Sequence, residues 1–262
     1  MASDASPSDV ETVLVRAEKL LVEGQKLLSE LQGAVRLTGM SPDGTFPIFY
    51  QDQVVHIALP WAAVDNLQMS FATRRGPADI VFFEQLLDFI PTLEEKAFLD
   101  VGSYTGTFAM FVRRFLKPVV THMFEPQNVM IDALHKTISV NDDAKDVVLH
   151  QAIIDEDDVA HAIGAYRPDK LSEVKYLRRD GGKLQSRSID SFGIENVGYI
   201  NFDFPNSKIN AVKGAMQTIR RDRPVMTFDM GARDVKELQV ALEPLDYEAI
   251  RAGRNSMIFL PK

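Results

Sequence analysis

The chain has 262 residues, of which 45% are hydrophobic and 25% charged, and its formal net charge is −8. This composition is typical of a globular protein with one large domain and an appendage. The negative charge disfavours nucleic acid as a partner, because a phosphate backbone selects basic surfaces. The absence of cysteine excludes disulfides, thiolate catalysis and cysteine-based metal sites. No apolar run reaches the ~18 residues of a membrane span, and residues 1–9 lack a signal-peptide core. We therefore expect a cytoplasmic protein that does not bind membranes.

The first predicted element is an amphipathic helix over residues 8–37. Apolar residues recur there at alternating three- and four-residue steps, and Ser8 with Glu11 forms a capping box. The spacing suits a coiled-coil seam between two copies of the chain, although Gly24 falls on the seam and weakens it. Packing of the helix within a single chain is the equal alternative.

A β-hairpin is predicted next, from the strand-like segments Phe46–Tyr50 and Val54–Leu59 on either side of a short polar turn. A helix is predicted from Pro77 to Ile90. Arg74 and Arg75 lie between these elements and could hold an anion, but a solvated loop is the favoured interpretation. We place the helix and hairpin in an appendage, 1–76, and the remainder in a main domain, 77–262.

From residue 97 onward, strand-like and helix-like segments alternate with short links. Such alternation predicts a mostly parallel sheet with helices on both faces. Tyr247–Ala252 and Ser256–Leu260 have no helix between them and predict a final antiparallel hairpin. The fold class is therefore α/β, with a doubly wound seven-stranded sheet. The other strands are expected at 97–102, 119–124, 147–153, 198–204 and 224–230, and the helices at 107–116, 128–140, 208–220 and 233–242.

A long insertion at 155–187 interrupts this alternation. Asp180, Gly181 and Gly182 predict a turn between Val174–Leu177 and Leu184–Ser188. The acidic run 155–158 is interpreted as a solvated face. Loops of this length often carry substrate contacts.

The segment around Asp100 has the strongest functional signal. An apolar run ends at Asp100, glycines follow at 102 and 106, and a helix-like segment begins at Thr107. This order predicts a buried strand, a tight turn and a helix whose N-terminus faces a ligand. Glu125 ends the next strand, where an acid can accept hydrogen bonds from both ribose hydroxyls of a nucleoside. The spacing is not the dinucleotide pattern G-x-G-x-x-G, and it suits a positively charged nucleoside such as S-adenosylmethionine.

Several motifs between about residues 97 and 230 together resemble the FkbM-like family of S-adenosylmethionine-dependent methyltransferases. They are Asp100–Gly106, Phe124–Pro126, Asn141, His150–Ala152, Ser188–Asp190, Tyr199–Asp203, Val212–Ala215 and Arg223–Pro224, in the family's order and spacing. The resemblance implies a class I methyltransferase fold and an O-methyltransferase that acts on a hydroxyl of a sugar or natural product.

The chain departs from the family at the end of the fourth strand. The family usually has lysine-isoleucine-aspartate there, followed after a spacer by glutamate-glycine and a second glutamate. Asn201 occupies the lysine position and Asp203 is retained. Pro205, Asn206 and Lys208 occupy the other three positions. This departure concerns acid-base chemistry and substrate binding, and it leaves the cofactor motifs intact.

The resemblance also implies a set of cofactor contacts. Glu125, followed by Pro126, would hold the ribose. Gln151, followed by Ala152, would contact the adenine, with a solvent-facing strand end as the equal alternative for Gln151. The methionine end would be lined by Asp100, Gly102, Ser103, Tyr104 and Gly106.

Two aspartates are the candidate catalytic residues. Asp203 is the best candidate for removing a proton from an alcohol, because it lies at the carboxyl edge of the predicted sheet, where ligands of open α/β folds bind. Asp229 ends the neighbouring strand. The two carboxylates could share a proton or bind Mg²⁺ with Asn206, but a helix cap is the favoured role of Asp229, so we predict no metal site. His150 could act as a base, although a structural role is favoured.

Three functions remain open from the sequence. The first is O-methylation of a small-molecule or glycan acceptor. The second is a cofactor-binding or scaffold protein without chemistry, motivated by the replaced glutamate-glycine-glutamate positions and the N-terminal helix. The third is a nucleotide-dependent oxidoreductase, which the missing G-x-G-x-x-G pattern disfavours.

Overall fold

The computed structural model of the chain describes residues 23–24, 40–41, 44–90, 92–164, 167–230, 232–253 and 255–262. The helix predicted for residues 8–37 lies outside this part apart from two residues, so its role in self-association stays a prediction. Among the described helices, none combines the length and the apolar character that crossing a bilayer requires.

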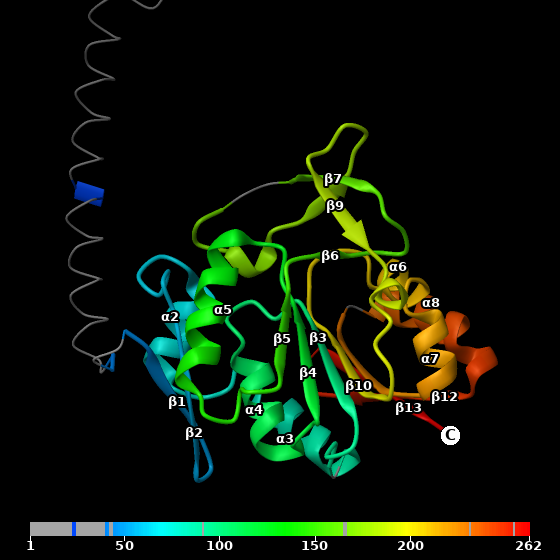
Figure 1. The fold of residues 1–262 in the computed structure, drawn as a ribbon, viewed down its shortest axis with the longest axis horizontal. Coiled ribbons are helices and arrows are strands. Elements are labelled where there is room, and N and C mark those ends of the chain that lie inside the picture. Colours follow the sequence, from blue (N-terminus) through cyan, green and yellow to red (C-terminus); the bar gives the residue numbers. More distant parts are fainter. Residues whose placement is uncertain are drawn as a thin grey trace, which may run out of the picture.

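A seven-stranded sheet forms the centre of the described fold (Figure 1). Its order is β12-β13-β11-β10-β3-β4-β5. The strands from β11 to β5 are parallel, and β13 pairs antiparallel with both β11 and β12. The doubly wound sheet that ends in an antiparallel hairpin is therefore confirmed. The strands are β3 (Ala97–Val101), β4 (Val120–Phe124), β5 (Val147–His150), β10 (Val197–Phe202), β11 (Val225–Asp229), β12 (Tyr247–Ala252) and β13 (Ser256–Pro261).

The direction of winding reverses between β3 and β10. The chain proceeds from β3 outward to β4 and β5, and then returns to the other side of β3 to form β10 and β11. In open α/β sheets, such a switch point opens a crevice at the carboxyl ends of the strands, where ligands bind. The fold therefore places the motif residues that follow β3, β4 and β10 around one crevice.

Helices cover both faces of the sheet, and successive residues of β3 enter different cores. Phe98 packs in the core with Phe83 of α3 (Ile80–Phe89) and Met110 of α4 (Thr107–Leu116). Leu99 packs in the other core, with the helices that follow β10 and β11. A strand buried on both faces explains the continuous apolar run in the sequence. The remaining helices are α5 (Asn128–Val140), α6 (Lys208–Lys213), α7 (Met216–Asp222) and α8 (Ala232–Leu242), with 3₁₀ turns at Leu171–Glu173, Ile189–Phe192 and Glu243–Leu245.

The single helix predicted for residues 208–220 is wrong, because the chain forms α6 and α7 with a break at Gly214. A Cβ at Gly214 would lie 2.3 Å from the carbonyl oxygen of Asp155. Close backbone contact with the insertion therefore occupies the place where a continuous helix would carry a side chain.

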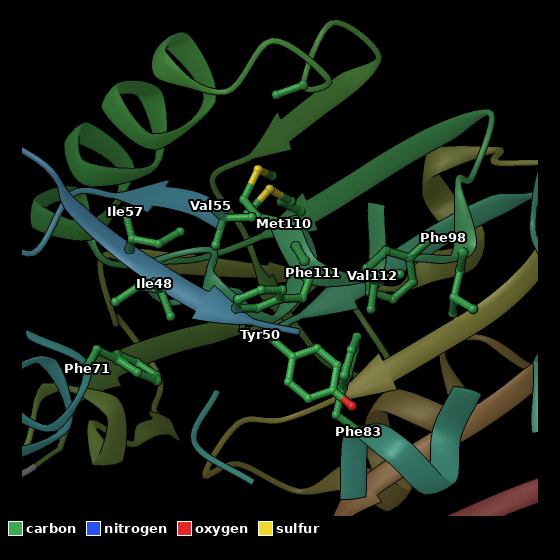
Figure 2. Close-up of a cluster of buried hydrophobic side chains, with 14 of the residues drawn as sticks. Ile48, Tyr50, Val55, Ile57, Phe71, Phe83, Phe98, Met110, Phe111 and Val112 are labelled. Carbon is green, nitrogen blue, oxygen red and sulfur yellow. The ribbon is translucent and has the colours of Figure 1, made fainter. Parts of the chain in front are cut away.

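The predicted N-terminal hairpin is present as β1 (Phe46–Tyr50) and β2 (Gln53–Ile57), which pair antiparallel. Figure 2 shows Ile48, Tyr50, Val55 and Ile57 gathered in one cluster with Met110 and Phe111 of α4. The domain boundary at residue 76 stays a prediction, but the hairpin shares its core with the main sheet.

Helix α5 also holds the hairpin through side chains. Asn141 accepts a hydrogen bond from the His56 backbone N–H at 3.0 Å and donates to the His56 carbonyl at 2.7 Å. Thr137 accepts from the Ala58 backbone N–H at 3.1 Å. These bonds satisfy the outer backbone groups of β2, which otherwise form an open sheet edge.

One helix was not predicted, α2 (Asn66–Arg74). It begins at Asp65, whose side chain accepts a hydrogen bond from the Gln68 backbone N–H at 2.9 Å. Gln68 is fully buried in the middle of the helix face. A buried polar residue breaks the apolar stripe by which an amphipathic helix is identified from sequence.

The insertion forms a small four-stranded sheet, which lies at the top of Figure 1. Its order is β6-β9-β7-β8. The predicted turn at 180–182 joins β8 to β9, and β7 lies between these two strands and pairs antiparallel with both. A Cβ at Gly182 would lie 2.3 Å from the His161 carbonyl oxygen, which places the turn against β7. The strands are β6 (Ile153–Ile154), β7 (Ala160–Ile163), β8 (Tyr176–Arg178) and β9 (Leu184–Arg187).

Two predictions about this region are corrected. The strand expected at 147–153 ends at His150, because Ile153–Ile154 leaves the main sheet to pair with β9. The acidic run is not a wholly solvated face, since Asp155 is buried. Its carboxylate accepts a hydrogen bond from Arg178 Nε at 2.9 Å and lies 3.1 Å from His161 Nε2. Burying a carboxylate requires such partners.

Candidate active site

Two adjoining cavities, of about 450 Å³ and 310 Å³, lie at the carboxyl ends of the strands. Both open over the switch point between β3 and β10. We call them the larger and the smaller cavity. The residues that border both are Leu67, Ala78, Gly102, Tyr104, Asp203 and Asp229.

The turn after β3 brings the backbone close to the end of β10. Gly102 has φ +92°, and a Cβ there would lie 2.0 Å from the Asp203 carbonyl oxygen. Gly106 has φ +82°, and its Cβ would lie 2.9 Å from a side-chain carbon of Leu134. Both positions therefore favour glycine for their conformation, and Gly102 also for space, because its neighbour is backbone. The motif glycines create the tight turn that the sequence predicts.

Glu125 borders the larger cavity and is only 3% exposed. Its Oε2 accepts a hydrogen bond from the Tyr104 backbone N–H at 3.0 Å, and its Oε1 accepts from the Gln127 backbone N–H at 2.9 Å. Burial raises the pKa of Glu125 to about 7, and the two backbone bonds oppose this rise. Each carboxylate oxygen keeps a second acceptor site, so the group can accept hydrogen bonds from two further donors.

Asp100 borders the smaller cavity and is 1% exposed. Its Oδ1 accepts a hydrogen bond from Asn201 Nδ2 at 2.8 Å, while its Oδ2 has no partner among the described residues. Burial raises the pKa of Asp100 to about 6, with the Asn201 bond opposing. An unpaired buried carboxylate oxygen is costly, and a cationic group of a ligand would relieve that cost.

Tyr104 has φ +51° and borders both cavities. The hydroxyl donates to Asp65 Oδ1 at 2.7 Å. Asp65 is fully buried, and its Oδ2 accepts from the Leu171 backbone N–H at 2.8 Å. One carboxylate thus joins α2, the glycine turn and the insertion. Sequence reasoning missed Asp65, although its position before a helix is an N-cap signal.

Asp203 faces both cavities, and its side chain is exposed to them. Protein surrounds it at longer range, and this desolvation, followed by the nearby charge of Asp229, raises the pKa of Asp203 to about 6. Lys208 opposes the rise. Asp203 is thus a carboxylate that is ionised at neutral pH and more basic than an ordinary aspartate.

Asp229 and Asn206 also lie near Asp203. Asp229 is exposed and borders both cavities. Asn206 is engaged elsewhere, because it accepts from the Tyr176 backbone N–H at 3.0 Å and donates to the Tyr176 carbonyl at 2.6 Å. The described residues contain no group of three or more His, Cys, Asp or Glu side chains suited to a metal ion.

Only one of the two residues predicted to contact the adenine borders a cavity. Ala152 and Pro126 border the larger cavity. Gln151 is exposed, donates to Asn128 and borders neither cavity, so the structure does not bring it into the site. His150 stacks on Phe124 at 4.6 Å and borders neither cavity, in keeping with the structural role favoured for it.

Several cavity residues had no signal in the sequence. Val174 and Tyr176 of the insertion border the larger cavity, in keeping with the expectation that this loop contributes contacts. Phe71 of α2, Phe82 and Phe108 form an apolar wall of the smaller cavity. Asn255 and Ser256 also border this cavity. Only the tertiary fold brings these segments together.

No protein-family model matches the sequence, and a search of curated proteins finds no match. Solved structures with a similar fold include the methyltransferase FkbM from Methylobacillus flagellatus KT, with 16% identity and a TM-score of 0.49 over 63% of this chain and 44% of that chain. This chain therefore spans less than half the length of that protein.

Two further similar structures are an rRNA methylase from Streptococcus thermophilus and TYW2 from M. jannaschii in complex with AdoMet. The first has 11% identity and a TM-score of 0.44 over 69% of this chain and 96% of that one. The second has 10% identity and a TM-score of 0.42 over 85% and 89%. Similarities of this size carry no inference about chemistry, so the function is derived from the site itself.

Proposed function

We propose that this protein is an S-adenosylmethionine-dependent methyltransferase that acts on a hydroxyl group. The observation that carries the proposal is the pair of buried carboxylates at the carboxyl ends of neighbouring strands in one crevice. Glu125 can accept two further hydrogen bonds, and Asp100 has an unpaired oxygen. S-adenosylmethionine carries both matching groups, a ribose diol and a cationic methionine end.

The residues present fit this cofactor. Glu125 would hold the ribose, and the larger cavity offers Phe124, Ala152 and Ile153 as apolar surface for a base. The methionine end would lie in the smaller cavity beside Asp100, Gly102 and Ser103. The glycine turn permits the close backbone approach that such a ligand needs.

The bound cofactor supplies a methyl group on a sulfonium, which is already activated for displacement. The protein then has to align the acceptor and remove its proton. Asp203 faces both cavities, and a pKa of about 6 leaves it ionised at neutral pH and able to take a proton. We therefore assign Asp203 as the general base, with Asp229 beside it raising its basicity.

A small-molecule or glycan acceptor fits the smaller cavity. Apolar walls from Phe82 and Phe108 lie beside the polar Asn255 and Ser256, which suits a compound with both a ring face and hydroxyls. Asp79, Asp203 and Asp229 also border this cavity. Their negative charge opposes a phosphate backbone, so we propose a sugar or natural-product hydroxyl rather than nucleic acid.

Transfer of a labelled methyl group tests the proposal against a panel of glycosides, phenols and transfer RNA. We expect transfer to a glycoside or phenol. Asp203→Asn should lower turnover by about 100-fold and leave S-adenosylhomocysteine affinity within about twofold. Glu173→Gln is the control, because Glu173 borders the larger cavity but is exposed and paired with Lys170. Absence of transfer despite cofactor binding, or an active Asp203→Asn variant, would contradict the assignment.

A non-catalytic cofactor-binding protein is the second candidate. It is favoured by Asn206, which stands where the resembling family has glycine and binds the insertion backbone instead. In that case Asp203→Asn would change no activity, and no acceptor would be methylated. Calorimetry with NAD(P) against S-adenosylhomocysteine separates both candidates from an oxidoreductase.

A further inference from the structure

A row of four buried polar side chains crosses the centre of the sheet and ends at Asp100. Asn201 of β10 is in register with Asp100 of β3 on one side and with Thr227 of β11 on the other. Tyr199 lies two residues before Asn201, on the same face of β10. Tyr199 and Thr227 are fully buried, and Asn201 is 5% exposed. Apolar residues fill most of this core, so the row needs an explanation.

The hydrogen bonds in the row have one consistent direction. Thr227 Oγ1 donates to Asn201 Oδ1 at 2.8 Å, and Asn201 Nδ2 donates to Asp100 Oδ1 at 2.8 Å. The Tyr199 hydroxyl lies 2.6 Å from Thr227 Oγ1. A threonine hydroxyl has a single proton, which Thr227 gives to Asn201, so Tyr199 must be the donor to Thr227. Every proton in the row therefore points toward Asp100.

The reverse direction is unfavourable because of Tyr199. It would require a protonated Asp100 that donates to a flipped Asn201 amide, which donates to Thr227, which donates to Tyr199. The Tyr199 proton would then need another acceptor, and within the described residues Thr227 is its only partner. Its ring is fixed by stacking on Phe98 at 4.8 Å. A buried donor without an acceptor costs free energy, so Tyr199 keeps Asn201 as a donor to Asp100. A donated hydrogen bond is stronger to a carboxylate than to a neutral acid, so the row favours the ionised Asp100.

We propose that Tyr199 and Thr227 are positioning residues that orient the Asn201 amide and so hold Asp100 as a carboxylate ready for the cationic end of the ligand. This inference rests on the proposed function. Asn201 occupies the position where the resembling family has lysine. A neutral amide supports the carboxylate through one oxygen and leaves its negative charge for the ligand, whereas a lysine would neutralise it.

The row of hydrogen bonds lowers the pKa of Asp100, whereas the neighbouring negative charge of Asp203 raises it. Asp100 in turn raises the pKa of Glu125. Tyr199 stays a phenol, because burial raises its pKa well above its ordinary value. Loss of the row should therefore raise the pKa of Asp100, so that the carboxyl gains its proton closer to neutral pH.

The test compares binding of S-adenosylhomocysteine and of adenosine by calorimetry between pH 5.5 and 8. Adenosine has the ribose and base but no ammonium, so it reports on the Glu125 end alone. For Thr227→Val we expect S-adenosylhomocysteine affinity to fall about fivefold at pH 6.5 and about twofold or less at pH 8. Adenosine affinity should stay within about twofold at both pH values.

Two further variants keep the test decisive. Thr227→Ser retains the hydroxyl and should restore the wild-type pH profile. Tyr199→Phe removes only the terminal donor, retains the ring packing, and should give a smaller shift in the same direction. Identical pH profiles in all variants, or equal losses for both ligands, would overturn the inference. If the wild-type protein bound neither ligand, the proposed function itself would fail.

Discussion

The carboxylates that border the crevice are held in two different ways. In the larger cavity, Glu125 is buried and held by two backbone N–H groups, and the turn that supplies one of them is anchored to Asp65 through Tyr104. Asp203 and Asp229, which border both cavities, are exposed, whereas Asp100 in the smaller cavity is buried like Glu125. Buried carboxylates therefore form the proposed cofactor contacts, and exposed side chains form the proposed acceptor contacts. A cofactor site needs one fixed geometry, and an acceptor site can change by substitution of exposed residues without loss of the fold.

The largest expected effect comes from Gly102, where the two cavities meet. Gly102→Ala places a Cβ 2.0 Å from the Asp203 carbonyl oxygen at φ +92°. We expect a loss of about 3–5 kcal/mol in the free energy of unfolding, together with loss of cofactor binding. Chemical denaturation measures the first and calorimetry the second.

Gly44→Ala is the matched control for this variant. Gly44 has φ +84°, and the Cβ that alanine adds would meet nothing within 4 Å, so only the conformational cost of about 1 kcal/mol applies. Equal destabilisation by the two substitutions would show that the close contact between Gly102 and the Asp203 carbonyl contributes nothing to the loss.

Substitution of Asp65 tests whether the larger cavity depends on the hydrogen bonds of this carboxylate to Tyr104 and Leu171. Asp65→Asn can still cap α2, but its amide cannot accept a hydrogen bond from the Leu171 N–H. We expect a loss of about 2–3 kcal/mol in the free energy of unfolding and faster hydrogen exchange at the Leu171 amide. Asp79→Asn serves as the comparison, because Asp79 caps α3 through Phe82 and is only partly buried. That variant should stay within about 0.5 kcal/mol of wild type, and a similar loss in both would remove the special role of Asp65.

A smaller effect is expected from pH. The pKa of Glu125 is raised to about 7 and that of Asp100 to about 6, so the folded protein binds more protons than the unfolded chain between about pH 4 and 7. Asp203, whose pKa is also raised to about 6, acts in the same direction. The free energy of unfolding of the ligand-free protein should therefore fall as pH rises through this window. Denaturation at pH 5, 6 and 8 measures this slope. S-adenosylhomocysteine should flatten it, and a slope of the opposite sign would contradict the burial of the two carboxylates.

The sequence predicted the elements of the main sheet because both faces of its strands are buried, which produces apolar runs such as 97–99 before Asp100. It also predicted the acids at the carboxyl ends of the strands, since Asp100 and Glu125 stand beside recognisable turns. These features are local in the sequence, and local patterns are what sequence reasoning detects.

The features that were missed depend on contacts between distant segments. Pairing of β7 between β8 and β9 cannot be derived from turn residues, and the buried Gln68 hid α2. Ala152 borders the larger cavity and Gln151 does not, and the end of β5 at His150 before both residues is a boundary that the sequence does not mark. The row from Tyr199 to Asp100 becomes visible only when the register of three strands is known.

The most direct test of the central claim is calorimetric titration of S-adenosylhomocysteine into the wild-type protein and the Glu125→Gln variant, with Glu173→Gln as control. The account predicts binding by the wild type and the control, and at least about tenfold weaker binding by Glu125→Gln, because an amide cannot accept hydrogen bonds through both of its terminal atoms. Equal affinity in all three proteins, or no heat with the wild type, would contradict the claim that Glu125 holds a nucleoside above the end of β3.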